Sequence, residues 1–515
     1  MPVADLILKN ANVLTVDPEQ PKAEAVAVKG DKILLVGGAE DLDSVSGVGT
    51  RIIDCQGKTL VPGFNDAHCH IFSFLREQIG VDLSPSSVSS ISDIKAAIHN
   101  KAQKIPWGQW IRGNGYNDFY LAGKRHPTRW EIDEVAPHHP VVLAHRSLHA
   151  CVLNSLALAL AGITRETEEP PGGHIDRDLG SGEPNGLLFD MLGYIREKVM
   201  PSISEAELDE GITLASQHYL SQGITSLQDA TVVNDLSRWR RFQHFVETGR
   251  LKSRLSMMAG IEVINQFQEA GLSPGSGDIH LRLGGAKLVP NEIPGHLYPP
   301  QPEFNRLVLE AHRAGFQVAI HASRWETVEA AITALGNAQS QIPRPDTRHR
   351  IEHCSECPPH LLGRLKELQA VVVTQPPFVY YSGERYLATV PADRQPWLYR
   401  IRSLLDGGLV VAASSDSPIV PANPLVGVYA AVSRQVESGQ LLLPEERISA
   451  AQALAMYTIN AAYATFDEGI KGSITPGKLA DMVILSADPT AVPPERIKDI
   501  RVEMTILGGE VVWEA

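Results

Sequence analysis

The stretch Pro62-Gly63-Phe64-Asn65-Asp66-Ala67-His68-Cys69-His70 ends an apolar run on two histidines that lie two residues apart. Alternate side chains of a strand point to the same face, so we expect His68 and His70 on one face, with Cα atoms about 6–7 Å apart. Two imidazoles placed in this way can bind one cation of the zinc type. Taken alone, the pair is explained as readily by two histidines with ordinary hydrogen bonds, because some of the 18 histidines will fall two apart by chance.

This stretch is the first of eight short β-rich runs, which are mostly separated by segments of helix length. They lie at Val61–His70, Ile224–Asp229, Arg254–Ala259, Leu281–Leu288, Phe316–His321, Arg350–His353, Val371–Gln375 and Leu409–Ser415. Strands that alternate with helices predict parallel βαβ units. Eight such units predict an α/β fold closed as a (β/α)₈ TIM barrel rather than an open sheet.

The connection after the first run, residues 71–223, is far too long for one crossover helix. It holds helix-like and loop-like stretches at Ser92–Lys104, Asn154–Ala161 and Glu205–Ser221 and a glycine- and proline-rich piece at Pro170–Gly186. We therefore expect an inserted subdomain here that covers the mouth of the barrel.

Both chain ends read as short strands separated by polar turns. The runs are Asp5–Lys9, Ala25–Lys29 and Lys32–Gly37 near the N-terminus, and Leu479–Leu485, Val502–Leu507 and Val511–Trp513 near the C-terminus. Pairing between the two ends would make one small composite β-sandwich from residues 1–61 and 470–515. The metal-dependent barrel would then occupy residues 62–469.

Four more polar residues stand at or near the carboxyl ends of later runs: His321, His353, Asp416 and, on the fourth run, Lys287. Barrel active sites are built at this face. Singly, each has an ordinary explanation: a histidine at the edge of the core, a helix N-cap for Asp416, or a solvated amine for Lys287. Their shared placement with the first two histidines makes a joint accident improbable and predicts a metal site.

Composition bounds the class of protein. The chain has 515 residues and a net charge of −14, which argues against a nucleic-acid partner. No window approaches the roughly 18 apolar residues of a membrane helix, and Met1–Leu6 lacks the basic start of a secretory signal. Five cysteines suit a reducing cytoplasm. The pair Cys354 and Cys357 has redox or zinc spacing, but without a second such pair two ordinary thiols are the better interpretation.

Several motifs, in order along nearly the whole chain, are similar to one known family. They are Ala23–Val28, Pro62–His70, His149–Leu158, Gly223–Asp229, Arg350–His353 and Gly477–Asp481. With them the chain resembles the amidohydrolase superfamily and, within it, the YtcJ-like branch called amidohydrolase family 3. The resemblance implies a barrel with a composite β-domain, and hydrolysis of a non-peptide amide or related C–N bond at a centre of one or two divalent metals, with zinc the expected ion.

Carried over by position, the resemblance assigns His68 and His70 with Asp416 to the first metal, and His321 and His353 to the second. Lys287 matches a lysine that CO₂ carbamylates in two-metal members, where it bridges the ions. The modification makes chemical sense, because an ammonium cannot ligate a cation and a carbamate can.

The chemistry expected at such a centre is attack on a carbonyl by a metal-activated hydroxide. Asp416 would take the proton from the water and deliver it to the leaving nitrogen. His149, which lies in the insert, is the candidate for orienting the carbonyl, and a purely structural role is equally open. Asp66 is expected to brace a ligand rather than touch substrate.

The sequence differs from the family pattern near the expected site, and these differences leave the substrate open. Many relatives read His-Ala-x-Gly-Asp on the fifth strand, where this chain has His321-Ala322-Ser323-Arg324-Trp325. Arg324 and Trp325 either clamp an anionic or aromatic part of the substrate or serve as packing residues. The partner is expected to be a small molecule, without nucleic acid or membrane, and a homodimer is left open.

Two other functions are compatible with a barrel of this kind. One is a deaminase that removes ammonia from a heterocycle, against which Arg324 counts, because related deaminases carry an acid at that position. The other is a barrel that has lost its metals and serves as a scaffold, against which the intact ligand set argues.

Overall fold

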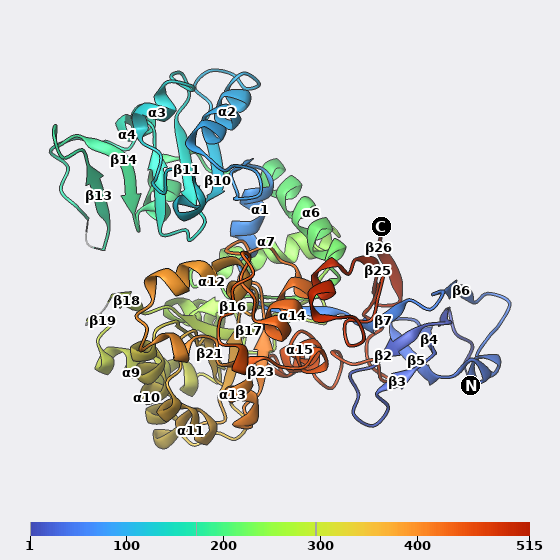
Figure 1. The fold of residues 1–515 in the computed structure, drawn as a ribbon. Coiled ribbons are helices and arrows are strands. Elements are labelled where there is room, and N and C mark those ends of the chain that lie inside the picture. The colour runs from blue at the N-terminus through green and yellow to red at the C-terminus, as the bar shows by residue number, and fades with distance from the viewer. Residues whose placement is uncertain (1, 171, 294–295) are drawn as a thin grey trace. The chain divides into compact units, whose positions relative to one another are not determined.

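The computed structural model describes residues 2–170, 172–293 and 296–515. Contacts divide the chain into two compact units, Met1–His70 with Ser216–Ala515, and Ile71–Ala215. Figure 1 shows both as a ribbon and labels many of their helices and strands. The division separates most of the expected insert from the rest of the chain. The individual domain limits and the placement of the insert over the barrel mouth stay predictions.

The first unit contains an eight-stranded sheet in the order β23-β22-β21-β20-β17-β16-β15-β8, with every hydrogen-bonded pair parallel. The strands are β8 (Phe64–Cys69), β15 (Ile224–Asp229), β16 (Arg254–Gly260), β17 (Leu281–Leu288), β20 (Val318–Ala322), β21 (Arg350–His353), β22 (Val371–Thr374) and β23 (Val411–Ala413). The sheet nearly closes on itself, because the Asp416 N–H donates to the His68 carbonyl and the His70 N–H to the Ser417 carbonyl, both at 2.8 Å. The predicted (β/α)₈ fold is confirmed.

Helices lie outside these strands (Figure 1). They are α7 (Leu236–Glu247), α8 (Ile264–Glu269), α9 (Gln301–Arg313), α10 (Trp325–Gln341), α11 (Pro359–Glu367), α12 (Pro377–Thr389), α13 (Ile401–Asp406), α14 (Pro424–Ser433), α15 (Ala450–Met456) and α16 (Ile459–Tyr463). Helix α9 shows why they pack as they do: Phe304, Val308 and Ala311 recur every three or four residues and form its buried stripe. Between β17 and α9 lies a hairpin of β18 (Asn291–Ile293) and β19 (His296–Tyr298).

The first predicted run, Val61–His70, is two strands rather than one. β7 (Thr59–Pro62) pairs antiparallel with β24 from the C-terminal end, and β8 begins the barrel after Gly63. A Cβ on Gly63 would lie 2.1 Å from Thr225 Oγ1, so the close approach of β15 requires glycine here. The chain therefore passes from a terminal sheet into the first barrel strand within one residue.

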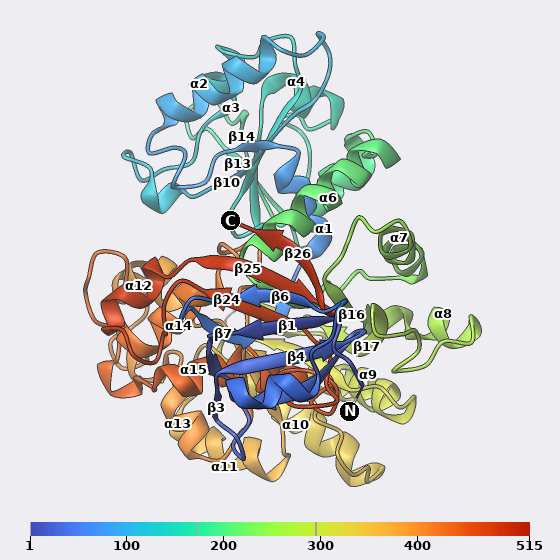
Figure 2. The ribbon, with the colours of Figure 1, turned by 90° about the vertical axis from the view of Figure 1, so that its right-hand side faces the viewer.

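Strands from both chain ends lie side by side (Figure 2). They form one sheet in the order β26-β25-β24-β7-β2-β3 and another in the order β5-β4-β1-β6. Their bounds are β1 (Leu6–Lys9), β2 (Asn12–Leu14), β3 (Lys22–Ala23), β4 (Ala25–Lys29), β5 (Lys32–Gly37), β6 (Arg51–Asp54), β24 (Met482–Leu485), β25 (Val502–Leu507) and β26 (Glu510–Glu514). Leu8 and Val26 of one sheet and Leu60 and Met482 of the other share a single core, so residues from both chain ends bury one another.

A buried ion pair joins the terminal sheets to the barrel. Arg254, the first residue of β16, donates from Nε to Asp481 Oδ2 at 2.7 Å and from Nη2 to Oδ1 at 2.9 Å, and both side chains are 4% exposed. Asp481 also accepts from the Gly508 N–H. A two-pronged arginine–carboxylate pair of this kind fixes geometry as well as contributing energy.

The second unit is built on a six-stranded sheet in the order β13-β14-β12-β11-β10-β9. Its elements are α1 (Ile71–Gln78), β9 (Val81–Asp82), α2 (Ile91–Ala102), β10 (Ile111–Tyr116), α3 (Arg129–Asp133), β11 (Val141–His145), β12 (Ala150–Leu153), α4 (Ser155–Leu160), β13 (His174–Arg177), β14 (Pro184–Phe189), α5 (Leu192–Tyr194) and α6 (Glu205–Ser221), the last of which runs across the limit between the units. The three helix-like stretches are helices, but the sheet was not predicted. Among the described residues of the whole chain, every helix is too short or too polar to cross a bilayer.

Candidate metal centre

His68, His70 and Asp416 come together at the carboxyl ends of the first and last barrel strands. His70 Nε2 lies 3.0 Å from Asp416 Oδ1, and His68 Nε2 lies 3.5 Å from the same oxygen. One donor atom from each of the three residues fits within a mutual distance of 4.8 Å. The two histidines share a face of β8, as alternation along a strand predicts, and their ring centroids are 5.3 Å apart.

Asp416 occupies a left-handed backbone conformation, with φ of 58°. Its N–H bonds to the His68 carbonyl, so the backbone that carries the carboxylate is tied to the strand that carries the histidines. Strained residues of this kind cluster at functional sites. Burial alone would raise the pKa of Asp416, but contact with His70 and the nearby His68 and His353 hold that pKa well below its usual range.

His353 and His321 extend the cluster across the barrel. The His353 ring centroid lies 4.9 Å from that of His68 and 4.4 Å from that of His321. His353 also has a left-handed backbone, with φ of 69°, at the end of β21. Burial, and then the neighbouring His321, lower the pKa of His353 to about 4, so it is a neutral imidazole able to ligate at neutral pH.

Lys287 reaches the same region from β17. Its side chain is buried, with 1% of the residue exposed, and Nζ has no hydrogen-bond partner within the described part of the chain. Burial lowers the pKa of Lys287 to about 8, despite the nearby carboxylates of Glu352 and Asp416. A buried amine without a partner is unusual, because such groups are nearly always hydrogen-bonded.

The second nitrogen of each of three histidines is occupied, which fixes how each ring is turned. His68 Nδ1 contacts Glu352 Oε2, His70 Nδ1 lies 3.0 Å from Thr231 Oγ1, and His353 Nδ1 lies 2.8 Å from Gln375 Oε1. The Nε2 atoms of His68 and His70 are then left to face Asp416. Contacts of this type are typical around metal-binding histidines.

Sequence reasoning missed Glu352 and its partner Arg350. Arg350 donates to Glu352 from Nε at 2.6 Å and from Nη2 at 3.0 Å, and neither side chain is exposed. The guanidinium also binds the Ala67 carbonyl, beside His68. The sequence does contain a signal for this pair. Arg350 and Glu352 are opposite charges two residues apart on a strand predicted to line the barrel, where an unpaired buried charge is very costly.

Asp66 contacts the backbone that holds the cluster. Its Oδ1 accepts from the Ser415 N–H at 3.0 Å and from the His68 N–H at 3.3 Å, and the Ser415 hydroxyl contacts Oδ2. Burial raises the pKa of Asp66 to about 6. These contacts agree with the expectation that it braces a ligand.

The contacts of the remaining predicted residues are as follows. His149 belongs to the second unit, where its Nδ1 lies 2.7 Å from Asp190 Oδ1 and its side chain is 76% exposed. Arg324 Nε is 3.6 Å from Glu326 Oε2, and the ring centroids of Trp325 and Trp397 are 6.3 Å apart, so the packing explanation of both residues has contacts to support it. Cys354 and Cys357 are buried and free, as the interpretation of two ordinary thiols expects.

Known proteins resemble this chain over nearly its full length. The family described as "Amidohydrolase family" matches residues 51–513. The chain is 30% identical to N-substituted formamide deformylase of Arthrobacter pascens, over 99% of this chain and 98% of that protein. It is 28% identical to the putative amidohydrolase YtcJ of Bacillus subtilis, over 98% of each. A crystal structure of an uncharacterized metal-dependent hydrolase from Pyrococcus furiosus superposes with a TM-score of 0.74 and 26% identity, over 94% of this chain and 99% of that one.

Proposed function

Because the chain belongs to the amidohydrolase family and is thus a hydrolase of C–N bonds, we propose that it cleaves a non-peptide amide at a divalent metal centre, with Asp416 as the proton carrier. The observation that carries the proposal is the convergence of His68, His70 and Asp416 at one point of the barrel.

The donor set fits a divalent cation of the zinc type. His68 and His70 present ring nitrogens, Asp416 presents a carboxylate oxygen, and hydrogen-bonding groups hold the far side of both rings. His321 and His353 would hold a second ion. A cation bound there lowers the pKa of a water molecule and polarises a carbonyl.

Asp416 would accept the proton that a water molecule loses on attacking the amide carbon. It would then pass that proton to the nitrogen as the C–N bond breaks, so that the products are an amine and a carboxylic acid, which loses its own proton at neutral pH. Its suppressed pKa keeps the carboxylate ionised before the reaction, as an acceptor must be.

We propose that Lys287, once its amine has reacted with CO₂ to form a carbamate and release a proton, would be a further ligand of the metal centre. Lys287 Nζ is buried and has no hydrogen-bond partner in the described part of the chain, which supports this proposal. A carbamate would give that buried position an acceptor group and a negative charge, both of which suit a cation. Labelled bicarbonate should yield a carbamate signal in NMR spectra of the enzyme and none in Lys287→Ala. An unmodified lysine in the metal-loaded enzyme would remove the assignment.

Among amides, N-substituted formamides are the first class to test, since a relative matched over its full length carries the name N-substituted formamide deformylase. His149 is assigned to orient the carbonyl, and Arg324 and Trp325 to contact the substituent. For each, replacement by alanine should raise KM. An unchanged KM in all three variants would place the substrate elsewhere.

The experiment is metal analysis followed by a substrate panel. Purified enzyme is assayed for metal content and then offered N-substituted formamides, the matching N-acetyl amides, cyclic amides and amino-substituted heterocycles, with amine and ammonia measured separately. We expect at least one zinc-type ion per chain and release of amine from a formamide or acetamide. Release of ammonia from a heterocycle would favour a deaminase, and a metal-free protein without activity would favour a scaffold.

A further inference from the structure

A cavity of about 260 Å³ opens at the amino-terminal ends of the barrel strands, the opposite ends from those that carry the metal-site residues. The starts of β16 and β17 line it, together with the loops before β17, β20 and β21 and the segment after α16. Two consecutive glycines keep it open. A Cβ on Gly284 would lie 2.6 Å from Ser256 Oγ, and one on Gly285 would lie 2.7 Å from the Gln317 carbonyl oxygen.

Three polar groups of the cavity wall make no hydrogen bond within the described part of the chain. They are the hydroxyls of Ser256 and Thr347 and the side-chain oxygen of Gln317, although these residues are only 6%, 8% and 7% exposed. The amide nitrogen of Gln317 is used, because it donates to the carbonyls of Arg348 and Ala464. These three atoms are not enclosed by protein but open to the cavity, so they are available to hydrogen-bond to a molecule bound there.

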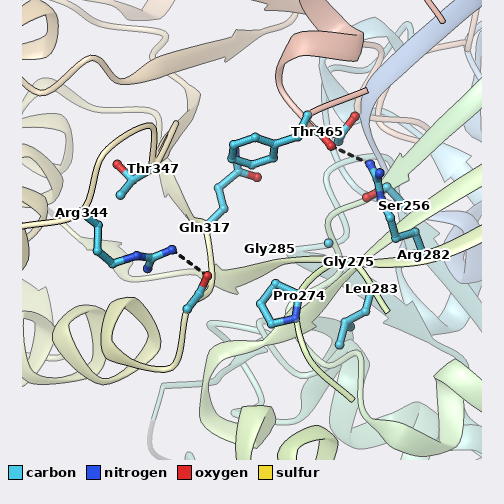
Figure 3. Close-up of a pocket in the computed structure, with 13 residues that line it drawn as sticks. Ser256, Pro274, Gly275, Arg282, Leu283, Gly285, Gln317, Arg344, Thr347 and Thr465 are labelled. Atoms are coloured by element: carbon cyan, nitrogen blue, oxygen red, sulfur yellow. Dashed lines mark hydrogen bonds between the residues drawn. The ribbon is translucent and has the colours of Figure 1, made fainter. Parts of the chain in front are cut away.

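The cavity also holds one positive charge without a carboxylate. Arg344 donates to the carbonyls of His312, Phe316 and Gly315, which uses three of its five N–H groups and neutralises none of its charge. The other arginine of the lining, Arg282, is paired with Asp467 at 2.6 Å. In Figure 3, Arg344 and Thr347 lie on one side of the cavity, Ser256 and Arg282 lie on the other, and Gln317 lies between them.

The backbone around the opening is held in unusual conformations. Asp346 and Arg348, on either side of Thr347, have φ of 48° and 43°, and Phe466 has φ of 61°. None of them is glycine, for which such angles are ordinary. The Arg348 guanidinium lies 4.4 Å from the Phe466 ring centroid, which links the two strained segments. Strain of this kind clusters where a loop is held in place for a ligand.

We propose that this cavity binds a small organic carboxylate. The two unused N–H groups of Arg344 suit a carboxylate, which guanidinium groups bind in a planar, two-pronged manner. The hydroxyls of Ser256 and Thr347 can donate to the same oxygens, while Pro274, Leu283 and Phe466 offer apolar contact to the body of the ligand. At about 260 Å³ the volume is below the usual range of roughly 300–1,000 Å³ for drug-sized ligands, so an acid no larger than benzoate is expected.

The test is calorimetric titration of the metal-loaded enzyme with acetate, benzoate, phosphate and, as a cationic control, benzylamine. Thr347→Val keeps the shape of the side chain and removes its hydroxyl, whereas Ser256→Val removes a hydroxyl and fills space. Thr333→Val is the matched control, because Thr333 lies on the exposed side of α10 and outside the cavity. Melting temperatures establish that each variant is folded.

We expect saturable binding of benzoate, weakened about five-fold by Thr347→Val, the effect of losing one hydrogen bond. Ser256→Val should abolish it, and Thr333→Val should leave it unchanged. Tighter binding of phosphate than of either carboxylate would overturn the ligand class. Absence of saturable binding, or benzoate binding that competes with substrate and ignores both cavity variants, would overturn the site and leave a water-filled cavity.

Discussion

Replacement of Glu352 by glutamine tests how the metal site is held. The carboxylate accepts two hydrogen bonds from Arg350, at 2.6 and 3.0 Å, and contacts His68 Nδ1, and all of its surface is buried. Glutamine has nearly the same shape, but it removes the charge and turns an N–H group toward one of these donors. Arg350 is then a buried charge without compensation.

Two effects of known size follow. Breaking one partner of a buried ion pair costs about 3–5 kcal/mol, which for a chain of this length lowers the melting temperature by about 3–5 °C. Loss of the group that orients a metal-binding histidine lowers metal affinity by about 10–100-fold. The matched control is Glu329→Gln, because the Glu329 pair with Arg364, at 2.9 Å, has side chains 43% and 39% exposed and is worth about 0–1 kcal/mol.

The assay is a competitive titration of zinc against a chelating dye, with melting followed by circular dichroism. We expect Glu352→Gln to bind zinc more weakly, and to melt at a lower temperature, than either the wild type or Glu329→Gln. Zinc affinity within two-fold of the wild type, with a melting temperature like that of Glu329→Gln, would refute the assigned role of the carboxylate.

Three further predictions follow from other parts of the structure. Asp416→Asn should lower kcat by about 10²–10⁴-fold in the amidase assay, and near-normal turnover would end its role as proton carrier. Asp481→Asn leaves Arg254 buried beside an uncharged partner and should cost about 3–5 kcal/mol in a urea titration, with Asp499→Asn, in an exposed pair with Arg496, as the control. Burial and the neighbouring His312 lower the pKa of His349 to about 3, and the His349 Nδ1 accepts a hydrogen bond from the Val318 N–H. The folded state therefore holds His349 neutral, whereas in the unfolded state His349 takes up a proton below its ordinary pKa of about 6.5. Stability should therefore fall as pH drops from about 6.5 toward 3, and His349→Gln should flatten that loss in melting curves, whereas an unchanged slope would contradict it.

The barrel and its terminal strands could be predicted because their signal is local. Each barrel strand is a compact apolar run, and polar residues at the ends of five such runs indicate the face that carries the proposed metal site. The sheet of the second unit lacked that signal: β10 reads Ile111-Arg112-Gly113-Asn114-Gly115-Tyr116, with two glycines, an arginine and a buried asparagine in place of an apolar run.

The finer features of the site depend on backbone detail and on distant partners. Strand alternation places Arg350 and Glu352 on the opposite face from His353, and only the left-handed turn at His353 brings its ring to the other histidines. The break at Gly63 is set by Thr225, which lies far along the sequence. The cavity at the base of the barrel depends in the same way on loops that the sequence places far apart.

The direct passage from β7 through Gly63 into β8 has a consequence for the order of events during synthesis. His68 and His70 leave the ribosome early, but Asp416 follows about 20–70 seconds later at roughly 5–20 residues per second. The strand that holds β7 in place, β24, appears later still. Capture of a metal by the proposed ligands would therefore be a late event in the life of the nascent chain. A chain that ended between Asp416 and Met482 would carry all of the proposed ligands, while β7, which leads into the strand of His68, would lack its partner β24.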